Sequence, residues 1–207
     1  FWRNELSGHP LVLDLPTDYP RPPVQTYHGD LCSFQLDEGL TQSIRDLARS
    51  EGVIPYAIIL TAFYMLLYRY SGQNDILIGS PMRGRSNDEF AGIIGYFVNM
   101  VVLRADLSGN PTFKSLLSQV RTTVISALEH QDYPFEELVK ELAVPRDTGR
   151  NPVFEVMLNL LNLEENNRQE QAPTEKDREI HRDLHKISKF DLTLTVIDMG
   201  ENLSCSF

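Results

Sequence analysis

Apolar residues recur along this chain with two periods, one typical of helices and one typical of strands. Between residues 113 and 128 they return every three or four positions and mark one helical face: Phe113, Leu116, Leu117, Val120, Val124, Ala127 and Leu128. A shorter stripe of the same kind predicts an amphipathic helix that ends at Gly52: Leu40, Ile44, Leu47 and Ala48. Both segments are expected to pack one side onto a core.

Residues 56–70, YAIILTAFYMLLYRY, are apolar on nearly every side, which is typical of a helix buried all round. A membrane span is the competing interpretation. The run ends beside Arg69 after fifteen residues, however, whereas a bilayer requires about twenty. We therefore expect a central core helix, followed by a short buried strand at residues 76–78.

Other stretches favour strands. Residues 29–36 alternate weakly, and residues 153–161, VFEVMLNLL, form a second candidate. Between 190 and 196 apolar residues alternate with Asp191, Thr193 and Thr195, which predicts a half-buried strand, and residues 202–207 are expected to pair with it as a hairpin. Because helices and strands interleave, the sequence predicts an α/β sandwich with a mixed sheet packed against buried helices.

Composition narrows the classes of partner. The chain has 207 residues, 42% of them hydrophobic, and 29 acidic against 19 basic residues give a formal charge of −10. A chain of this charge without a basic cluster is not expected to bind nucleic acid or an anionic membrane surface. Cys32 and Cys205 lie far apart and outside any CxxC spacing, so we expect no disulfide framework and a reducing, cytoplasmic location.

Two segments resemble surface crossings. Four prolines between residues 16 and 23 predict an extended strap within an N-terminal crossover at 1–30, with a ligand for another protein as the alternative. Residues 164–180 are polar and charged and are expected to form a mobile surface excursion. The N-terminal FWRNELSGHP has no signal-peptide pattern and no initiating Met, so we expect a piece of a longer chain.

The stretch from Gly79 to Arg104 carries the first candidate site. Glycines at 79, 84, 92 and 95 mark two tight backbone passages ahead of an apolar strand. Arg83, Arg85 and Asn99 are polar groups that a plain core strand does not need. A loop followed by a buried strand is one interpretation, and the wall of a binding channel is the other.

The second candidate passage begins at His130. This residue is a possible general base, but no nucleophile or partner carboxylate is evident near it, which favours a structural role at the end of a helix. Asp132 is expected to cap the next helix, and Pro134 and Glu136 suit its first turn. His181 and His185 are four residues apart, but without a third ligand we expect no metal site.

A third polar passage, residues 146–152, contains Arg146, Asp147, Arg150, Asn151 and Pro152. Pro152 restricts Asn151 to extended geometry. We therefore expect the passage to lead straight into the following strand.

In this order and at these separations, GSPMRGR, IIGYFVNMVVLR, HQDYPFEELV and RDTGRNPVF resemble the later core motifs of nonribosomal peptide synthetase condensation domains. The segments LPTDYPRP and LLYRYSGQNDILIG extend the resemblance over essentially the whole chain. The chain departs from the family at Met100, where Thr is usual, and at Thr148-Gly149, where Ser usually stands second.

The resemblance implies a chloramphenicol-acetyltransferase-like fold, that of the CoA-dependent acyltransferases, and residues 1–207 as a C-terminal lobe. The family's HHxxxDG motif belongs to the other lobe, and no His-His pair occurs in this sequence. The implied reaction joins two thioesters carried on the phosphopantetheine arms of carrier domains. The implied partners are an N-terminal lobe, upstream and downstream carrier domains and an adenylation domain. We expect no directly bound cofactor and no activity from this lobe alone.

By the same resemblance, the residues expected at a substrate channel are Arg85, Gly95, Tyr96, Phe97 and Asn99. Those expected to fix the architecture are His130, Gln131, Asp132, Pro134, Phe135, Glu136, Arg146, Asp147, Arg150, Asn151 and Pro152. An outward salt bridge is the alternative for Arg85. Two other functions remain open: an epimerisation, heterocyclisation or other acyltransferase activity on the same fold, and a non-catalytic module that binds a protein.

Overall fold

The computed structural model describes residues 1–9, 12–85, 88–90, 92–145, 147–162 and 187–207. Its centre is a six-stranded sheet with the order β1-β6-β5-β4-β2-β3. The strands are β1 (Ser33–Leu36), β2 (Asp75–Met82), β3 (Asn99–Asp106), β4 (Val156–Asn162), β5 (Leu192–Asp198) and β6 (Leu203–Ser206). β4 pairs in parallel with both β2 and β5, and the remaining pairs are antiparallel. The predicted mixed sheet is confirmed.

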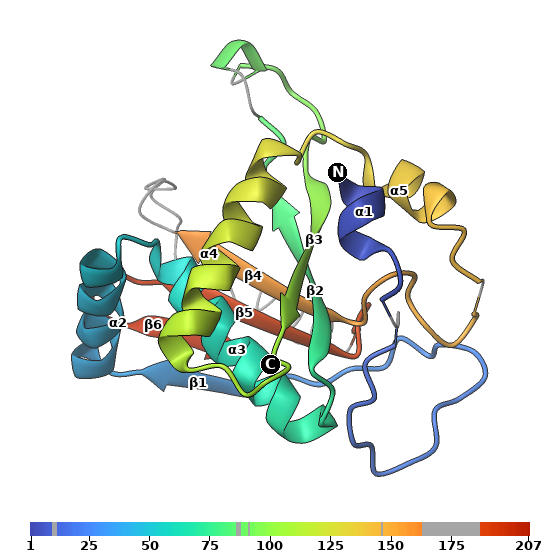
Figure 1. Cartoon of the computed structure of the whole chain (residues 1–207), viewed down its shortest axis with the longest axis horizontal. Coiled ribbons are helices and arrows are strands. Elements are labelled where there is room, and N and C mark those ends of the chain that lie inside the picture. The colour runs from blue at the N-terminus through green and yellow to red at the C-terminus, as the bar shows by residue number, and fades with distance from the viewer. Residues whose placement is uncertain (10–11, 86–87, 91, 146, 163–186) are drawn as a thin grey trace, which may run out of the picture.

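Helices cover one side of this sheet, and on the other side they reach only its β2–β3 end (Figure 1). α3 (Pro55–Ser71) and α4 (Phe113–Glu129) pack against each other on one side of the β2–β3 hairpin, and α2 (Glu38–Glu51) packs against α3. Two shorter helices, α1 (Trp2–Leu6) and α5 (Phe135–Glu141), lie together on the other side. The core forms where α3 and α4 meet the central strands.

α3 is the predicted core helix, although it is not buried all round. Leu60, Phe63 and Tyr64 are fully enclosed, whereas Leu66 and Tyr70 lie on an exposed side. The prediction of complete burial is wrong because the helix has a sheet on one side and helices beside it, but no layer outside it.

α2 and α4 begin at side-chain caps, where Asp37 accepts a bond from Leu40 N and Thr112 accepts one from Ser115 N. The stripe on α4 is confirmed except at Leu128, which is exposed. On α2 the fully buried positions are Thr41 and Ala48, and Leu40 in the first turn points outward. Gly52 ends α2 in the left-handed conformation, as expected.

The strand predictions hold in type but not in all their bounds. The β5–β6 hairpin is confirmed. The weakly alternating stretch yields a strand only from Ser33, preceded by an isolated bridge between His28 and Ile187. β4 starts at Val156, because Val153 has a φ of 72° and turns the chain just before the strand. Residues 146–152 therefore do not lead straight into β4 as predicted.

Candidate functional site

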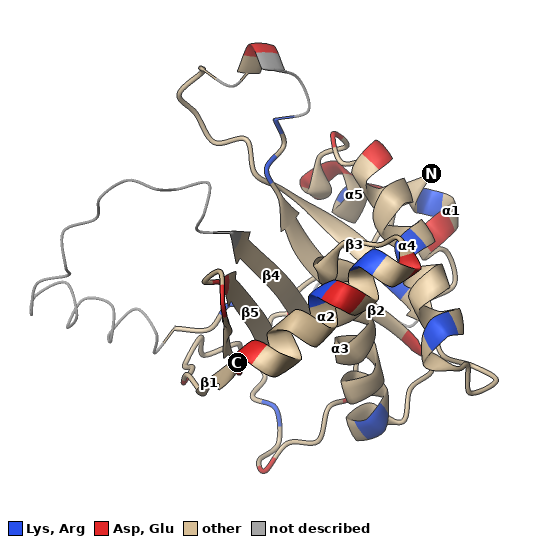
Figure 2. Ribbon diagram, turned by 90° about the vertical axis from the view of Figure 1, so that its left-hand side faces the viewer, with Lys and Arg blue, Asp and Glu red and all other residues tan. Residues whose placement is uncertain are grey.

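The first candidate passage is a loop that projects from the body of the protein. Its two ends are the last pair of the β2–β3 hairpin, Met82 and Asn99, and residues 83–85, 88–90 and 92–98 extend beyond them (Figures 1 and 2). Gly84 has a φ of 61° and lies against the carbonyl of Phe97, where a Cβ would collide. A glycine is therefore required where the two arms of the projecting loop come together.

Arg85 holds this loop from within. Its guanidinium donates hydrogen bonds to the carbonyl oxygens of Phe90 and Ile93, and it lies 4.2 Å from the centre of the Phe97 ring. Phe97 also stacks on Phe90. Arg85 was expected at a substrate channel. In the structure its guanidinium contacts groups of its own loop, and its side chain remains exposed to solvent.

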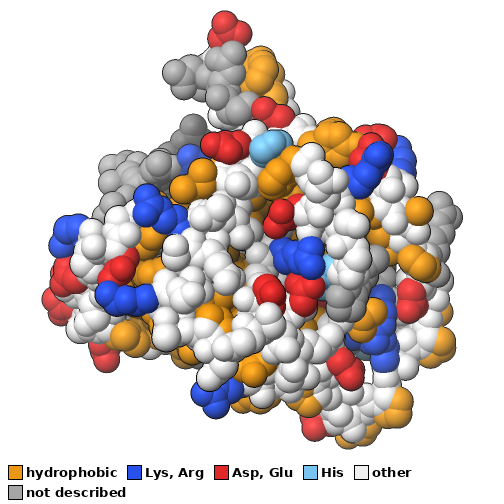
Figure 3. All heavy atoms as spheres, viewed as in Figure 1, with side chains coloured by type: hydrophobic (Ala, Val, Ile, Leu, Met, Phe, Trp, Pro, Cys, Tyr) orange, Lys and Arg blue, Asp and Glu red, His pale blue; other side chains and the backbone are white. Residues whose placement is uncertain are grey.

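The outer surface of the projecting loop is apolar. Ile94 is fully exposed, Tyr96 is 88% exposed, and Ile93 and Val98 are each more than two-fifths exposed. Hydrophobic atoms on the projection are visible in Figure 3. Gly95, between two of these residues, is exposed as well. Such a concentration of large exposed apolar side chains is typical of a surface that is covered by another domain or another protein.

Asn99 joins this loop to the second candidate passage. Its side-chain nitrogen donates to the carbonyls of Gln131 and Tyr133, at 2.6 and 2.7 Å, and its side-chain oxygen accepts from Phe135 N at 3.1 Å. Phe135 is the first residue of α5, and the N-cap position before it is Pro134, which has no side-chain cap bond. The N-cap position predicted at Asp132 is therefore wrong, and Asn99 from β3 supplies the acceptor for the first N–H of α5.

His130 ends α4, and its ring stacks on Phe1 with centroids 3.9 Å apart. Its Nδ1 lies 2.8 Å from the carbonyl oxygen of Ser126, which can only accept, so Nδ1 carries a proton. The His130 carbonyl accepts a bond from the Trp2 indole at 3.1 Å. A pocket of about 620 Å³ beside α1 is lined by Phe1, Trp2, His130 and Pro134, among others. Every one of these contacts fits the structural role.

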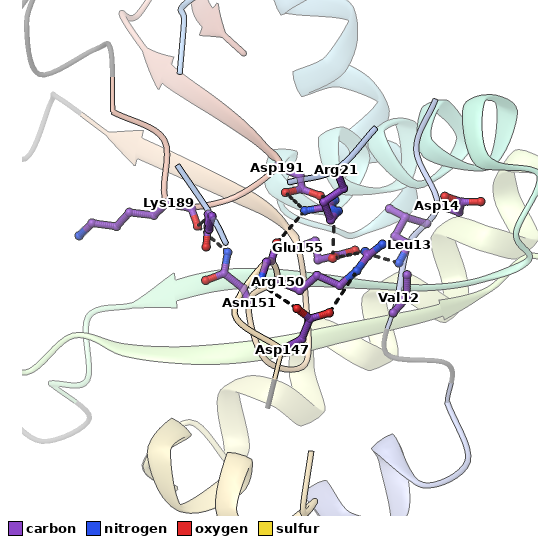
Figure 4. Close-up of polar contacts among 12 residues, drawn as sticks. Val12, Leu13, Asp14, Arg21, Asp147, Arg150, Asn151, Glu155, Lys189 and Asp191 are labelled. Carbon is purple, nitrogen blue, oxygen red and sulfur yellow. Dashed lines mark hydrogen bonds and ion pairs between the residues drawn. The ribbon is translucent and has the colours of Figure 1, made fainter. Parts of the chain in front are cut away.

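The third passage surrounds a buried carboxylate, that of Glu155, which is 2% exposed (Figure 4). Arg150 donates to it, Leu13 N donates to it at 3.1 Å, and Arg21 approaches to 3.8 Å. Arg21 also bonds Asp191, which raises the pKa of its guanidinium. These residues tie the N-terminal strap to the start of β5.

Two further residues of this passage contact other segments: Thr148 contacts the strap, and Asn151 contacts the segment before β5. Asp147 Oδ1 accepts from Gly149 N at 2.8 Å and orders the turn, and Thr148 donates to the carbonyl of Pro23. Asn151 donates to the carbonyl of Lys189, and Pro152 is exposed beside it. Arg146 lies outside the described residues, as do residues 164–180, His181 and His185.

Three residues of the contacts around the Glu155 carboxylate were not predicted from the sequence: Arg21, Glu155 and Asp191. Glu155 could have been noticed as a charge inside an apolar run, VFEVM. Arg21 and Asp191 carry no local signal, because their bond joins residues 170 positions apart.

A wide groove of about 1240 Å³ runs between the strap, the end of α3 and the starts of β4 and β5. Three exposed tyrosines, Tyr19, Tyr27 and Tyr70, stand along it. Within the described part of the chain, no three potential ligands gather into a metal site. No single helix of that part is long and apolar enough to cross a bilayer, and only α2 and α3 taken together, bent by 106°, pass that test.

Comparison with known proteins agrees with the motifs. The family model described as "Condensation domain" matches residues 1–207. A linear gramicidin synthase of Brevibacillus parabrevis is 44% identical over the whole chain, and surfactin synthase subunit 1 of Bacillus subtilis is 41% identical over 98% of it. The chain spans only 4% and 6% of those two proteins.

Solved structures share the fold. A four-domain nonribosomal peptide synthetase bound to AMP and glycine superimposes with a TM-score of 0.86 at 23% identity, covering 99% of this chain and 16% of that one. The X-domain from teicoplanin biosynthesis, in complex with OxyB, gives 0.83 at 25% identity over 99% of this chain and 45% of its own. These neighbours confirm the acyltransferase-like fold, and the chain belongs to the condensation domain family.

Proposed function

We propose that this chain acts as one lobe of a condensation domain that forms peptide bonds in nonribosomal peptide synthesis. The α-amine of one carrier-bound aminoacyl thioester attacks the carbonyl of another, the C–S bond breaks, and the thiol of the donor's phosphopantetheine arm leaves. The observation that carries the proposal is the family match over all 207 residues, with the four motifs in their expected order.

The chemistry explains what such a lobe contributes. A thioester is already activated, so catalysis depends on holding two tethered reactants in attack geometry and on keeping water away from the donor. Neither task requires a nucleophile from this chain. A rigid wall and a surface that seals against a second lobe, which bears HHxxxDG, are sufficient.

The projecting loop is the part of this lobe that we assign to that contact. Its exposed residues Ile94 and Tyr96 are suited to burial against another apolar surface. Arg85 and Phe97 fix the shape of the loop through the contacts described above. We therefore infer that Arg85 supports the channel by shaping this loop, with its charge facing loop carbonyls.

The decisive experiment compares this chain with a complete condensation domain that contains it. Both receive the same loaded donor and acceptor carrier domains, and the dipeptidyl thioester is measured by mass spectrometry. We expect product from the complete domain only. Product from this chain alone would refute the requirement for a second lobe, and no product from the complete domain with any loaded pair would refute the reaction.

A second candidate is a module that binds a protein without catalysis. It is favoured by one observation, that the X-domain, solved in complex with OxyB, has this fold. The groove beside the strap would be the binding surface here. A complete domain that retains a non-carrier protein tightly on a column, yet turns over no thioester, would support this candidate over the first.

A further inference from the structure

The turn between α4 and α5 is held by side chains from other elements. The carbonyls of residues 130, 131 and 133 accept bonds from Trp2 on α1 and from Asn99 on β3. The turn's own backbone bond, from Tyr133 N to the His130 carbonyl, is 3.4 Å long. At that length the bond is weak. The position of the turn is therefore set by Asn99 and Trp2 more than by its own backbone.

Asn99 connects this turn to the base of the projecting loop. It pairs with Met82 in the last residue pair of the β2–β3 hairpin, where the projecting loop begins and ends. Its side chain uses both donors and its acceptor on the turn, within 2.6 to 3.1 Å. One half-buried side chain thus links two of the family's motifs.

We propose that Asn99 is a positioning residue, which fixes the turn at 130–134 relative to the projecting loop and acts on the reaction only through these backbone bonds. This inference rests on the proposed function for its effect on turnover. The structural part of the inference does not depend on that function, because it predicts which backbone amides lose protection from hydrogen exchange when Asn99 is substituted.

Asn99→Asp gives the sharpest test. The carboxylate still accepts from Phe135 N but has no donor for the two carbonyls, and its charge faces both of them. Protonation restores one donor, so the defect should be relieved as pH falls. Asn99→Ala loses all three bonds and has no group to titrate.

Other titratable or charged groups stand on α1, the projecting loop, the turn and α5 around Asn99: Arg3, Glu5, Arg83, Arg85, Glu89, His130, Asp132, Tyr133, Glu136, Glu137, Lys140 and Glu141. They are the same in the wild type and in both variants. The ratio of variant to wild-type rate at each pH therefore removes their contribution.

The first measurement is peptide-bond formation by the complete domain between pH 4 and pH 8, a range that reaches down to the ordinary aspartate pKa of about 3.9. At pH 8 we expect kcat to fall about tenfold in both variants, from the loss of two or three hydrogen bonds, with KM for the carriers unchanged. On acidification the Asn99→Asp rate should approach the wild-type rate, whereas the Asn99→Ala ratio should stay flat. A wild-type kcat in Asn99→Ala, or parallel pH profiles for the two variants, would overturn the proposal.

The second measurement is amide hydrogen exchange in the same proteins, which needs no turnover. Phe135 N lies in the first turn of α5 and has no intrahelical partner, so its protection comes from Asn99. It should exchange at least tenfold faster in Asn99→Ala and stay protected in Asn99→Asp. If the wild-type domain forms no peptide bond, the proposed function is refuted, but the exchange measurement still tests the positioning role of Asn99. Unchanged exchange beside a lost kcat would place Asn99 on the substrate and refute a positioning role.

Discussion

The buried carboxylate of Glu155 predicts an unusually large cost for one substitution, Arg150→Met. Met keeps most of the aliphatic stem of Arg and removes its charge and donors. In the wild type, Arg150 donates to Glu155, whose side chain is 1% exposed. The variant leaves that carboxylate with Leu13 N at 3.1 Å and Arg21 at 3.8 Å.

The magnitude follows from what remains. Removing one partner of a fully buried ion pair costs about 3–5 kcal/mol in unfolding free energy. Here the Arg150 side chain is 24% exposed and Glu155 retains two contacts, which places the expectation near the lower bound, at about 3 kcal/mol. Arg21→Met should cost less, about 1 kcal/mol, since Arg21 bonds mainly to the partly exposed Asp191.

Urea unfolding followed by circular dichroism measures these differences, and a double-mutant cycle assigns them. If the cost is an uncompensated charge, Arg150→Met should add little once Glu155→Gln is present. We expect a coupling energy of at least about 1.5 kcal/mol for this pair and below about 0.5 for Arg21 with Glu155. Equal couplings, or an Arg150→Met variant within about 0.5 kcal/mol of the wild type, would contradict the picture of a charge kept buried by one arginine.

Four more substitutions, one of them a matched control, test separate features. Tyr64→Phe should raise the free energy of unfolding by about 1 kcal/mol in urea melts, because the fully buried Tyr64 hydroxyl has no hydrogen-bond partner among the described residues; a loss of stability would refute this. Tyr56→Phe is its matched control and should cost about 1 kcal/mol, because it breaks a 2.8 Å bond to Ser80. Gly84→Ala should leave the melting temperature of the core within a few degrees but abolish condensation, because the projecting loop cannot close; normal turnover would disprove that constraint. Arg85→Ala should lower condensation and expose the loop to limited proteolysis without unfolding the domain, and an unchanged digestion pattern would remove Arg85 from its assigned role.

Local periodicity was sufficient to predict helices of several turns and strands that pair with the next strand in the sequence. α4 and the β5–β6 hairpin were predicted because each pattern lies within one continuous segment. α1 was not predicted, because five residues are too few to show a helical period. The late start of β4 depends on the backbone of Val153, which residue type does not reveal.

The sequence motifs identified the candidate sites, but they did not predict the hydrogen bonds and ion pairs that the site residues make. The bonds from Asn99 reach residues more than thirty positions away, and the capping role given to Asp132 was the natural local choice. Only the fold could show that β3 supplies the cap. Likewise, a glutamate in an apolar run signals a buried charge, while its partner Leu13 N, 142 positions away, becomes visible only in the folded chain.

The strap also constrains how the protein is made. Leu13 bonds to a residue 142 positions later, and Arg21 to one 170 positions later. A ribosome that adds about 5–20 residues each second must therefore run for roughly another 7 to 34 seconds before the strap has a place to dock. During synthesis the first twenty-five residues remain accessible to chaperones and proteases, and docking of this segment should be among the last steps that complete the nascent domain.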